Sequence, residues 1–211
     1  MDIARFKKLP IMGIIRGIEE DTVAPLMEAV VSAGLETIEI TMNTMNAEKM
    51  ITRTVQAGHN RLMVGAGTVL TVESAKSALN AGATFIVMPV LIDEVVDYCV
   101  KNVIPVFPGA LTPGEIYRAW SAGATMVKVF PSGFFGPAYF KEIKSPFANI
   151  ELMACGGVTA KNISSYLASG ASAAAFGASI FKREWLAEKE FNKVAAEIQN
   201  LVQAFKRADV R

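Results

Sequence analysis

The sequence is poor in the residues that most often carry catalysis or bind metals. It contains a single histidine, His59, and two cysteines, Cys99 and Cys155, which form no C-x-x-C pattern. Ser-His-Asp triads, His-ligated metals, structural zinc sites and a disulfide framework therefore lack their main components. We expect no metal and no cofactor, and two unpaired cysteines fit a reducing cytoplasm.

Long apolar runs and basic clusters are also missing. Apolar stretches end well before the roughly 20 residues of a membrane span, and MDIARFKKLP lacks the apolar region and cleavage site of an export signal. The formal net charge is +1, with Lys and Arg scattered along the chain, whereas nucleic-acid-binding domains gather basic residues on one face. We expect neither a membrane nor a nucleic acid as partner. No linker or low-complexity stretch divides the chain, so residues 1–211 are expected to form a single domain.

A helical segment that ends in a small residue and a glycine recurs along the chain. Its copies are SAG, QAG, NAG, SAG and ASG, which end at Gly34, Gly58, Gly82, Gly123 and Gly170. Glycine just past a helix adopts the left-handed conformation that closes the last turn. Each copy therefore predicts a helix end that leads into a strand.

Short apolar or β-branched segments follow these glycines. They predict strands over 11–16, 37–41, 62–67, 85–89, 105–109, 126–130, 151–156 and 173–177. Helical segments lie between them, including one with a capping box at Thr112 and a last amphipathic helix at about 188–206. Eight βα units predict an α/β fold of the closed (β/α)8 TIM barrel type, because open doubly wound sheets more often have five or six strands.

Lys128 is the first candidate for chemistry, since active sites of such barrels lie at the C-terminal ends of the strands. Of the 13 lysines, it alone lies in the middle of a strand. Alternation points it into the barrel if Val127 and Val129 face the helices. Burial favours the neutral amine, which is the form that attacks a ketone carbonyl. The alternative is a lysine that pairs with an inward carboxylate for structure alone.

Glu39 is the expected partner of Lys128. It is flanked by Ile38 and Ile40, so the same alternation points it inward. Strands two and six lie opposite each other in an eight-strand ring and can share one layer of side chains. We therefore predict that the carboxylate faces the lysine and acts as a general acid/base, directly or through a water. A buried structural ion pair is the alternative, although such pairs contribute little stability.

Three rim features are candidates for anion binding. Arg16 ends strand one, where its guanidinium can hold a carboxylate or phosphate, or can simply be a solvated rim residue. The turns that contain Gly156 with Gly157 and Gly177 with Ser179 follow strands seven and eight, where many barrels bind phosphate. These glycines can also serve only as tight turns. A phosphorylated substrate is favoured.

The motifs IEIT, GAGTVL, KVFP, GGVT and GAS occur in an order and spacing that resembles the family of 2-keto-3-deoxy-6-phosphogluconate and 4-hydroxy-2-oxoglutarate aldolases over nearly the whole chain. The resemblance implies that Lys128 forms a Schiff base and Glu39 is the acid/base. It further implies that Thr68, Pro89 and Phe130 line the keto-acid pocket and that the glycine turns after strands seven and eight hold phosphate. Members are commonly homotrimers that need no metal.

The implied reaction is reversible cleavage of a 2-keto-3-deoxy-6-phospho sugar acid, of the phosphogluconate or phosphogalactonate type, to pyruvate and glyceraldehyde 3-phosphate. Asn43 and the segment 132–137 resemble the phosphogalactonate branch, in which Arg16 takes over an anion contact. Val90 and Cys155 depart from the family pattern near the substrate and leave the sugar acid open. Cleavage of 4-hydroxy-2-oxoglutarate to pyruvate and glyoxylate is the alternative.

Two other functions fit the same barrel. A phosphosugar isomerase or epimerase would use Glu39 as a base and Lys128 only as a charge. A non-catalytic phosphosugar-binding barrel would bind the same ligands and release no pyruvate.

Overall fold

Residues 1–209 are described in a computed structural model of the chain, in which parallel strands form one sheet in the order β5-β4-β3-β2-β1-β9-β8-β7-β6. The strands are β1 (Ile11–Ile15), β2 (Thr37–Thr41), β3 (Met63–Gly67), β4 (Ile86–Val87), β5 (Val106–Phe107), β6 (Gly109–Ala110), β7 (Val127–Val129), β8 (Leu152–Cys155) and β9 (Ala173–Phe176). Each lies within or within one residue of a predicted strand. The sheet confirms the predicted (β/α)8 barrel.

The ring closes through a break in the fifth predicted strand. β5 pairs with β4, β6 pairs with β7, and Pro108 joins the two short segments. Proline has no N–H group to donate to a neighbouring strand. Its carbonyl still accepts a hydrogen bond of 2.9 Å from the backbone N–H of Lys128. Nine strand segments therefore form eight barrel positions.

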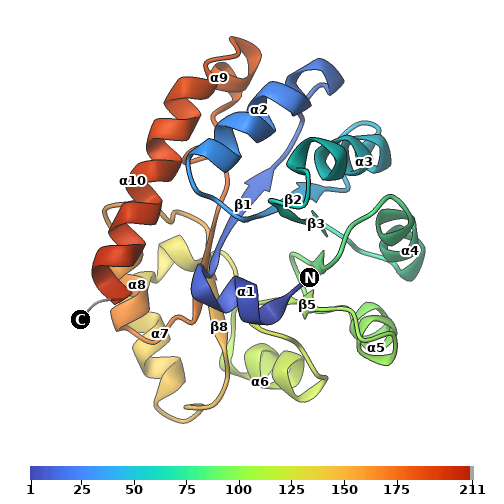
Figure 1. Cartoon of the computed structure of the whole chain (residues 1–211). Coiled ribbons are helices and arrows are strands. Elements are labelled where there is room, and N and C mark those ends of the chain that lie inside the picture. Colours follow the sequence, from blue (N-terminus) through green and yellow to red (C-terminus); the bar gives the residue numbers. More distant parts are fainter. Residues whose placement is uncertain (210–211) are drawn as a thin grey trace.

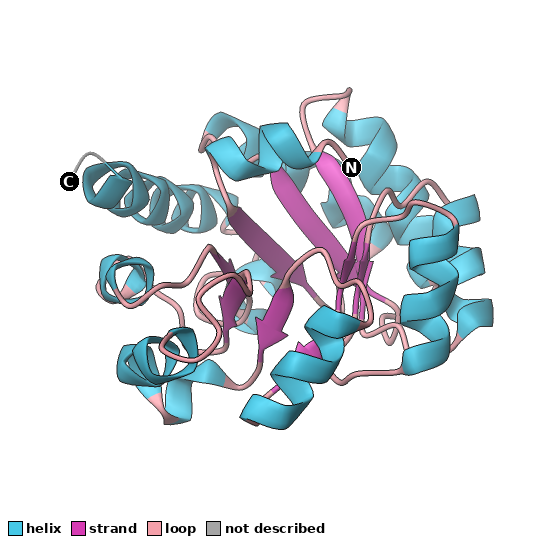
Figure 2. Ribbon diagram, turned by 90° about the horizontal axis from the view of Figure 1, so that it is seen from below, coloured by secondary structure: helices cyan, strands magenta, loops and turns pink. Residues whose placement is uncertain are grey.

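Helices surround the sheet and connect its strands (Figures 1 and 2). They are α1 (Ile3–Lys8), α2 (Glu20–Ser32), α3 (Ala47–Gly58), α4 (Val72–Asn80), α5 (Asp93–Lys101), α6 (Pro113–Ser121), α7 (Gly136–Lys144), α8 (Ile163–Ala168), α9 (Arg183–Ala187) and α10 (Phe191–Asp209), with a 3-10 turn η1 (Ser132–Phe134). The short helix α1 was not among the elements predicted from the sequence. The last helix begins at Phe191 rather than near residue 188, because a separate short helix precedes it.

Most predicted helix ends are confirmed, with one correction. Gly34, Gly82, Gly123 and Gly170 have positive φ angles directly after their helices or one residue later. Gly58 instead remains in the last turn of α3, and the left-handed conformation falls on His59, with φ of 44°. The capping box of α6 forms as predicted.

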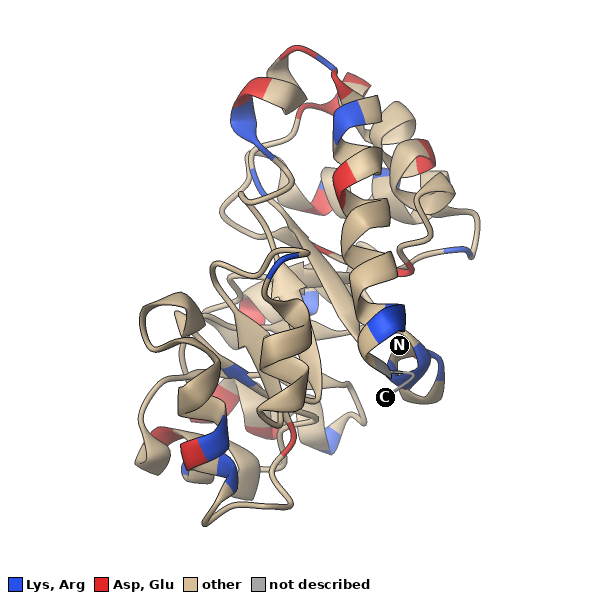
Figure 3. Ribbon diagram, turned by 90° about the vertical axis from the view of Figure 1, so that its left-hand side faces the viewer, with Lys and Arg blue, Asp and Glu red and all other residues tan. Residues whose placement is uncertain are grey.

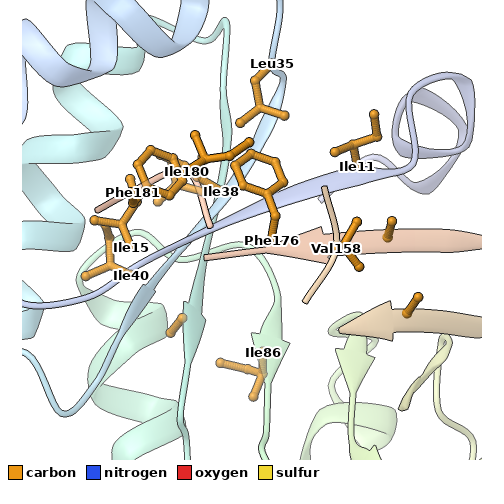
Figure 4. Close-up of a cluster of buried hydrophobic side chains, with 14 of the residues drawn as sticks. Ile11, Ile15, Leu35, Ile38, Ile40, Ile86, Val158, Phe176, Ile180 and Phe181 are labelled. Carbon is orange, nitrogen blue, oxygen red and sulfur yellow. The ribbon is translucent and has the colours of Figure 1, made fainter. Parts of the chain in front are cut away.

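Two apolar cores occupy the two faces of the sheet. The larger one fills the space between the strands and the outer helices, where Ile38, Ile40 and Phe176 pack (Figure 4). The smaller one lies inside the barrel and combines inward side chains at and next to the strands with Phe6 from α1. Its members are Phe6, Met12, Met63, Phe85, Val87, Phe107, Met126, Met153, Cys155, Ala173 and Ala175. The interior is thus filled at the N-terminal end, and polar inward side chains gather toward the other end.

The charged residues are spread over the outer helices, with both signs interspersed (Figure 3). Exposed ion pairs connect α2 to its neighbours. Lys49 and Arg53 of α3 pair with Glu20, and Lys189, between α9 and α10, pairs with Asp21. Across residues 1–209, no helix combines the length and the apolar character that a membrane span requires.

Candidate active site

Lys128 points into the barrel from the centre of β7. Val127 and Val129 on either side of it belong to the core between sheet and helices. The lysine itself is 6% exposed and lies in the strand opposite β2 in the ring. The structure therefore confirms that the Lys128 side chain points into the barrel.

Glu39 reaches the same space from β2. Ile38 and Ile40 pack in the outer core, and the Glu39 side chain is 1% exposed. Its Oε1 lies 4.0 Å from Lys128 Nζ, which is beyond the usual hydrogen-bond distance of about 3 Å. Its Oε2 is buried without a hydrogen-bond partner in the part of the chain that the structure describes. The two side chains face each other as predicted, and the carboxylate is only partly satisfied.

Burial dominates the electrostatics of Glu39. Removal from water raises the pKa of this carboxyl, while the charges of Lys128 and then Arg16 act in the opposite direction. Arg16 is itself exposed at the mouth of the barrel. It is close enough to influence the pKa of Glu39, yet its side chain remains available to a ligand.

Gly67, at the end of β3, makes room for the Glu39 carboxylate. A Cβ atom at this position would lie 2.3 Å from Glu39 Oε1. Thr68 follows with a φ of 55°, which is uncommon for a residue with a side chain. The GAGTVL motif that contains Gly67 was identified from the sequence, but the space that this glycine leaves for Glu39 was not predicted.

The two predicted pocket residues Phe130 and Pro89 lie at the same end of the barrel. The Phe130 ring is 40% exposed, and its centroid is 5.4 Å from Lys128 Nζ. Pro89 follows β4 and is partly buried, and its carbonyl packs so closely on Gly109 that a Cβ there would lie 2.1 Å from the Pro89 oxygen. An aromatic face therefore lies beside the lysine, and Pro89 packs against Gly109, which pairs with Lys128 in the sheet.

The glycine turns after β8 and β9 are joined to each other. Gly156 and Gly157 both have positive φ angles, of 99° and 76°. Ser179 Oγ donates a 2.9 Å hydrogen bond to the carbonyl of Val158, and the carbonyl of Gly177 accepts hydrogen bonds from the backbone N–H groups of Ile180 and Phe181. The two loops thus form one unit at the rim.

The helices after these turns do not begin at the glycines themselves. α8 starts at Ile163 and α9 at Arg183. The turns therefore offer backbone N–H groups rather than a helix N-terminus. Ser132, which the sequence analysis did not single out, donates through Oγ to the carbonyl of Gly156 at 3.1 Å and connects the loop after β7 to the same unit.

Cys155 is buried inside the barrel beside Lys128 and Glu39. Burial raises the pKa of its thiol to about 11, and the neighbouring lysine opposes this only in part. Because the thiolate is the reactive form, Cys155 is no nucleophile at neutral pH and serves as a small packed side chain.

The arrangement supplies a buried amine for covalent attachment of a carbonyl compound, a buried carboxyl for proton transfer and a rim suited to an anion. In residues 1–209, no group of three or more His, Cys, Asp or Glu side chains is placed to hold a metal ion. His59 lies at the opposite end of the barrel, before β3.

Comparison with known proteins gives consistent matches. The family model described as "KDPG and KHG aldolase" matches residues 3–197. The 2-dehydro-3-deoxy-6-phosphogalactonate aldolase of Escherichia coli strain K12 is 34% identical over 202 residues, which cover 95% of this chain and 97% of that protein.

Solved structures agree. One described as native KDPGal superposes with a TM-score of 0.90 at 33% identity and covers 97% of this chain and 98% of its own. A KDPG aldolase from Legionella pneumophila, with pyruvate captured at low pH as a covalent carbinolamine intermediate, has a TM-score of 0.86 at 25% identity and covers 94% of this chain and 96% of its own. The chain therefore belongs to the KDPG and KHG aldolase family.

Proposed function

We propose that this protein is a class I aldolase in which Lys128 forms a Schiff base with the ketone of a 2-keto-3-deoxy-6-phospho sugar acid and Glu39 transfers protons. The observation that carries the proposal is the buried pair itself, with Lys128 Nζ 4.0 Å from Glu39 Oε1 near the C-terminal ends of opposite strands. A buried lysine and carboxylate contribute little to stability, so their retention in one space favours a chemical role.

The proposed reaction begins with a covalent bond between Lys128 and the substrate and ends with the free lysine. The amine of Lys128 adds to the C2 carbonyl, and loss of water gives an iminium ion. Glu39, acting through a water, takes the proton of the C4 hydroxyl. The C3–C4 bond then breaks, its electron pair moves into the iminium to form an enamine, and glyceraldehyde 3-phosphate leaves. Protonation of the enamine at C3 and hydrolysis release pyruvate and the free lysine.

The remaining predicted residues support substrate binding. The Phe130 ring lies beside the lysine, and Thr68 and Pro89 follow β3 and β4 at the same end of the barrel. In this proposal the three residues accommodate the keto-acid part of the substrate. The turns at 156–157 and 177–179 lie at the rim, where backbone N–H groups bind phosphate. Arg16 is exposed at the mouth and pairs with a substrate anion.

The phosphogalactonate type of substrate is the first choice, because a relative of that activity covers nearly the whole chain at 34% identity. The phosphogluconate type is the close second. The description of the family model also favours testing 4-hydroxy-2-oxoglutarate, which would give pyruvate and glyoxylate. A lactate-dehydrogenase-coupled pyruvate assay on all three acids ranks them by kcat/KM.

The decisive test is borohydride reduction in the presence of pyruvate. We expect a pyruvate-derived mass on the peptide that carries Lys128. The Lys128→Ala variant must lose this adduct. The Glu39→Gln variant must still form the adduct on Lys128, while its rate of cleavage falls about 10²- to 10⁴-fold. Trapping that survives Lys128→Ala would refute the assignment. Isomerisation without a trapped adduct would indicate an isomerase or epimerase, and ligand binding without either would indicate a binding protein.

We further propose a homotrimer that works in the cytoplasm. The aromatic side chains of Phe134 and Phe135 are 86% and 57% exposed beside the active-site loop, which supports an association surface there. Light scattering coupled to size-exclusion chromatography measures the mass directly, and a value of one or two chains at micromolar concentration argues against the trimer.

A further inference from the structure

The turn after β8 contains two consecutive peptide groups whose carbonyl oxygens are held by side chains. The Gly156 carbonyl accepts a hydrogen bond of 3.1 Å from Ser132 Oγ, and the Gly157 carbonyl accepts one of 2.9 Å from Asn162 Nδ2. Ser132 is 1% exposed and begins η1, whereas Asn162 directly precedes α8. Side chains from two different segments therefore fix the orientation of two neighbouring peptide groups.

The N–H groups of the same two peptide groups donate to no other part of the protein. Both peptide bonds are trans, and a trans peptide points its carbonyl and its N–H in opposite directions. The N–H groups of Gly157 and Val158 therefore point away from the two side chains that hold the carbonyls. Within residues 1–209, neither N–H group has an acceptor. The next N–H, of Thr159, is by contrast bound to Asn162 Oδ1 at 2.8 Å.

Two adjacent N–H groups of this kind suit an anion. Successive backbone N–H groups in a turn form a concave site for phosphate and similar groups. Gly157 is exposed, so a ligand can approach its N–H from solvent. Hydrogen bonds from N–H groups to a charged oxygen are strong only when the donors are directed at it. The side chains that set the direction of these two donors therefore bear on how tightly the proposed phosphate site binds.

Ser132 is itself held in place, which enables its hydroxyl to hold the turn. The buried Tyr166 of α8 donates through its hydroxyl to the Ser132 carbonyl at 3.3 Å. The next residue, Gly133, packs so closely on the turn that a Cβ there would lie 3.0 Å from the Gly156 oxygen. Ser132 also follows Lys128 by only four residues. The hydrogen bond to Gly156 therefore ties the turn to the strand that carries the lysine.

We propose that Ser132 and Asn162 are positioning residues, which hold two carbonyl groups of the turn and so direct the N–H groups of Gly157 and Val158 at the phosphate of the substrate. The inference rests on the proposed aldolase function. Neither side chain needs to touch the phosphate. Without the Ser132 hydroxyl, the carbonyl that it holds loses its partner, and the glycines of the turn allow that peptide group to rotate. Phosphate binding then weakens, while the Schiff-base chemistry is unaffected.

The experiment compares Ser132→Ala with Ser164→Ala. The control is matched because Ser164 Oγ also donates to a backbone carbonyl, that of Ala204 at 3.4 Å, but this bond links the outer helices α8 and α10. We expect Ser132→Ala to raise KM for the phosphorylated sugar acid about 5- to 20-fold, with kcat within about twofold of the wild type. Borohydride trapping of pyruvate, which carries no phosphate, should be unchanged. Ser164→Ala should match the wild type in both measurements.

A second readout does not need turnover. Inorganic phosphate is titrated into the protein while the amide ¹H–¹⁵N signals of Gly157 and Val158 are followed by NMR. Both signals should move in the wild type and in Ser164→Ala, whereas Ser132→Ala should need about 5- to 20-fold more phosphate for half of the movement. Asn162→Ala, which removes the hydrogen bond to the neighbouring carbonyl, carries the same expectation and keeps the test open if Ser132→Ala does not fold.

Failure of this inference differs from failure of the proposed function. If the wild type releases pyruvate and its amide signals respond to phosphate, a Ser132→Ala variant with unchanged KM and an unchanged phosphate titration overturns the inference alone. A fall in kcat at unchanged KM overturns it as well, because the hydroxyl then acts on the chemistry rather than on phosphate binding. Wild-type amide signals that do not respond overturn both the inference and the phosphate site. A wild type that releases no pyruvate overturns the function, and the phosphate titration still decides whether the serine orients the turn.

Discussion

At the scale of single residues, the raised pKa of the Glu39 carboxyl makes cleavage sensitive to pH. Its ordinary value is 4.5, and burial outweighs the opposing charges of Lys128 and Arg16. The proposed mechanism uses the Glu39 carboxylate as the base in cleavage. The rate must therefore fall as the pH drops through a pKa above 4.5, while the carboxylic acid form accumulates.

Arg16→Gln tests this electrostatic account. Removing the cation withdraws a contribution that lowers the pKa of Glu39, so the acid limb of kcat should move to higher pH. Because Arg16 is exposed, the movement should be small and should shrink at high ionic strength. Arg53→Gln, which changes an exposed arginine paired with Glu20, is the control. If the acid limb of the kcat profile does not move in Arg16→Gln, Arg16 has no effect on the pKa of Glu39.

Gly67→Ala should impair activity more than stability. The new Cβ would lie 2.3 Å from Glu39 Oε1 and must displace the end of that side chain. A shift of about 1 Å in a catalytic group can cost about 10²-fold in rate. Gly114→Ala, where a Cβ meets nothing within 4 Å, is the matched control. Steady-state kinetics and urea unfolding on both variants separate the two effects, and wild-type kcat in Gly67→Ala would contradict the crowding.

The sequence predicted that Lys128 and Glu39 face each other inside the barrel. It did not predict the residues that pack around this pair. Lys128 and Glu39 follow from alternation along a strand and the symmetry of an eight-strand ring, and both are local or geometric rules. The roles of Gly67 and Ser132 depend on which atoms of another strand approach them. That information exists only once the register between strands is fixed.

At the scale of elements, the capping box at the start of α6 contributes measurably to the free energy of unfolding. Thr112 Oγ1 accepts from the Glu115 N–H, and the Glu115 carboxylate accepts from the Thr112 N–H at 2.8 Å. Thr112→Ala should lower the free energy of unfolding by about 1 kcal/mol. Borohydride trapping at Lys128 should be unchanged, because the cap lies outside the barrel. Urea unfolding measures the change in the free energy of unfolding. A loss of borohydride trapping in Thr112→Ala would show that the cap affects the active site.

Element boundaries were less predictable than element types. The fifth strand was predicted as continuous over 105–109, and Pro108 divides it because a proline leaves a gap in the ladder. Helix α1 was missed because six residues after an Asp2 cap give too short a pattern to detect. Gly58 was assigned the left-handed position that His59 takes, since a glycine is also tolerated within a last turn.

At the scale of the whole molecule, α1 contributes to the barrel through Phe6. This side chain is fully buried inside the barrel and packs edge-on against Phe107, with ring centroids 5.9 Å apart. Phe6→Ala should cost about 3–5 kcal/mol of unfolding free energy, as for other large side chains removed from a core. Met45→Ala, at a position 84% exposed, should cost almost nothing. Equal denaturation midpoints for the two variants would mean that the interior core does not depend on α1.

The filled N-terminal end of the barrel also has a consequence for how substrate enters and products leave. Because Phe6 and the interior methionines fill that end, we expect substrate and both products to pass through the C-terminal mouth of the barrel. In the proposed mechanism pyruvate remains bound covalently to Lys128 when the C3–C4 bond breaks, so the aldehyde departs before it. In the synthetic direction pyruvate must enter first. Initial-rate inhibition patterns should therefore show an ordered mechanism, with the aldehyde as the first product released.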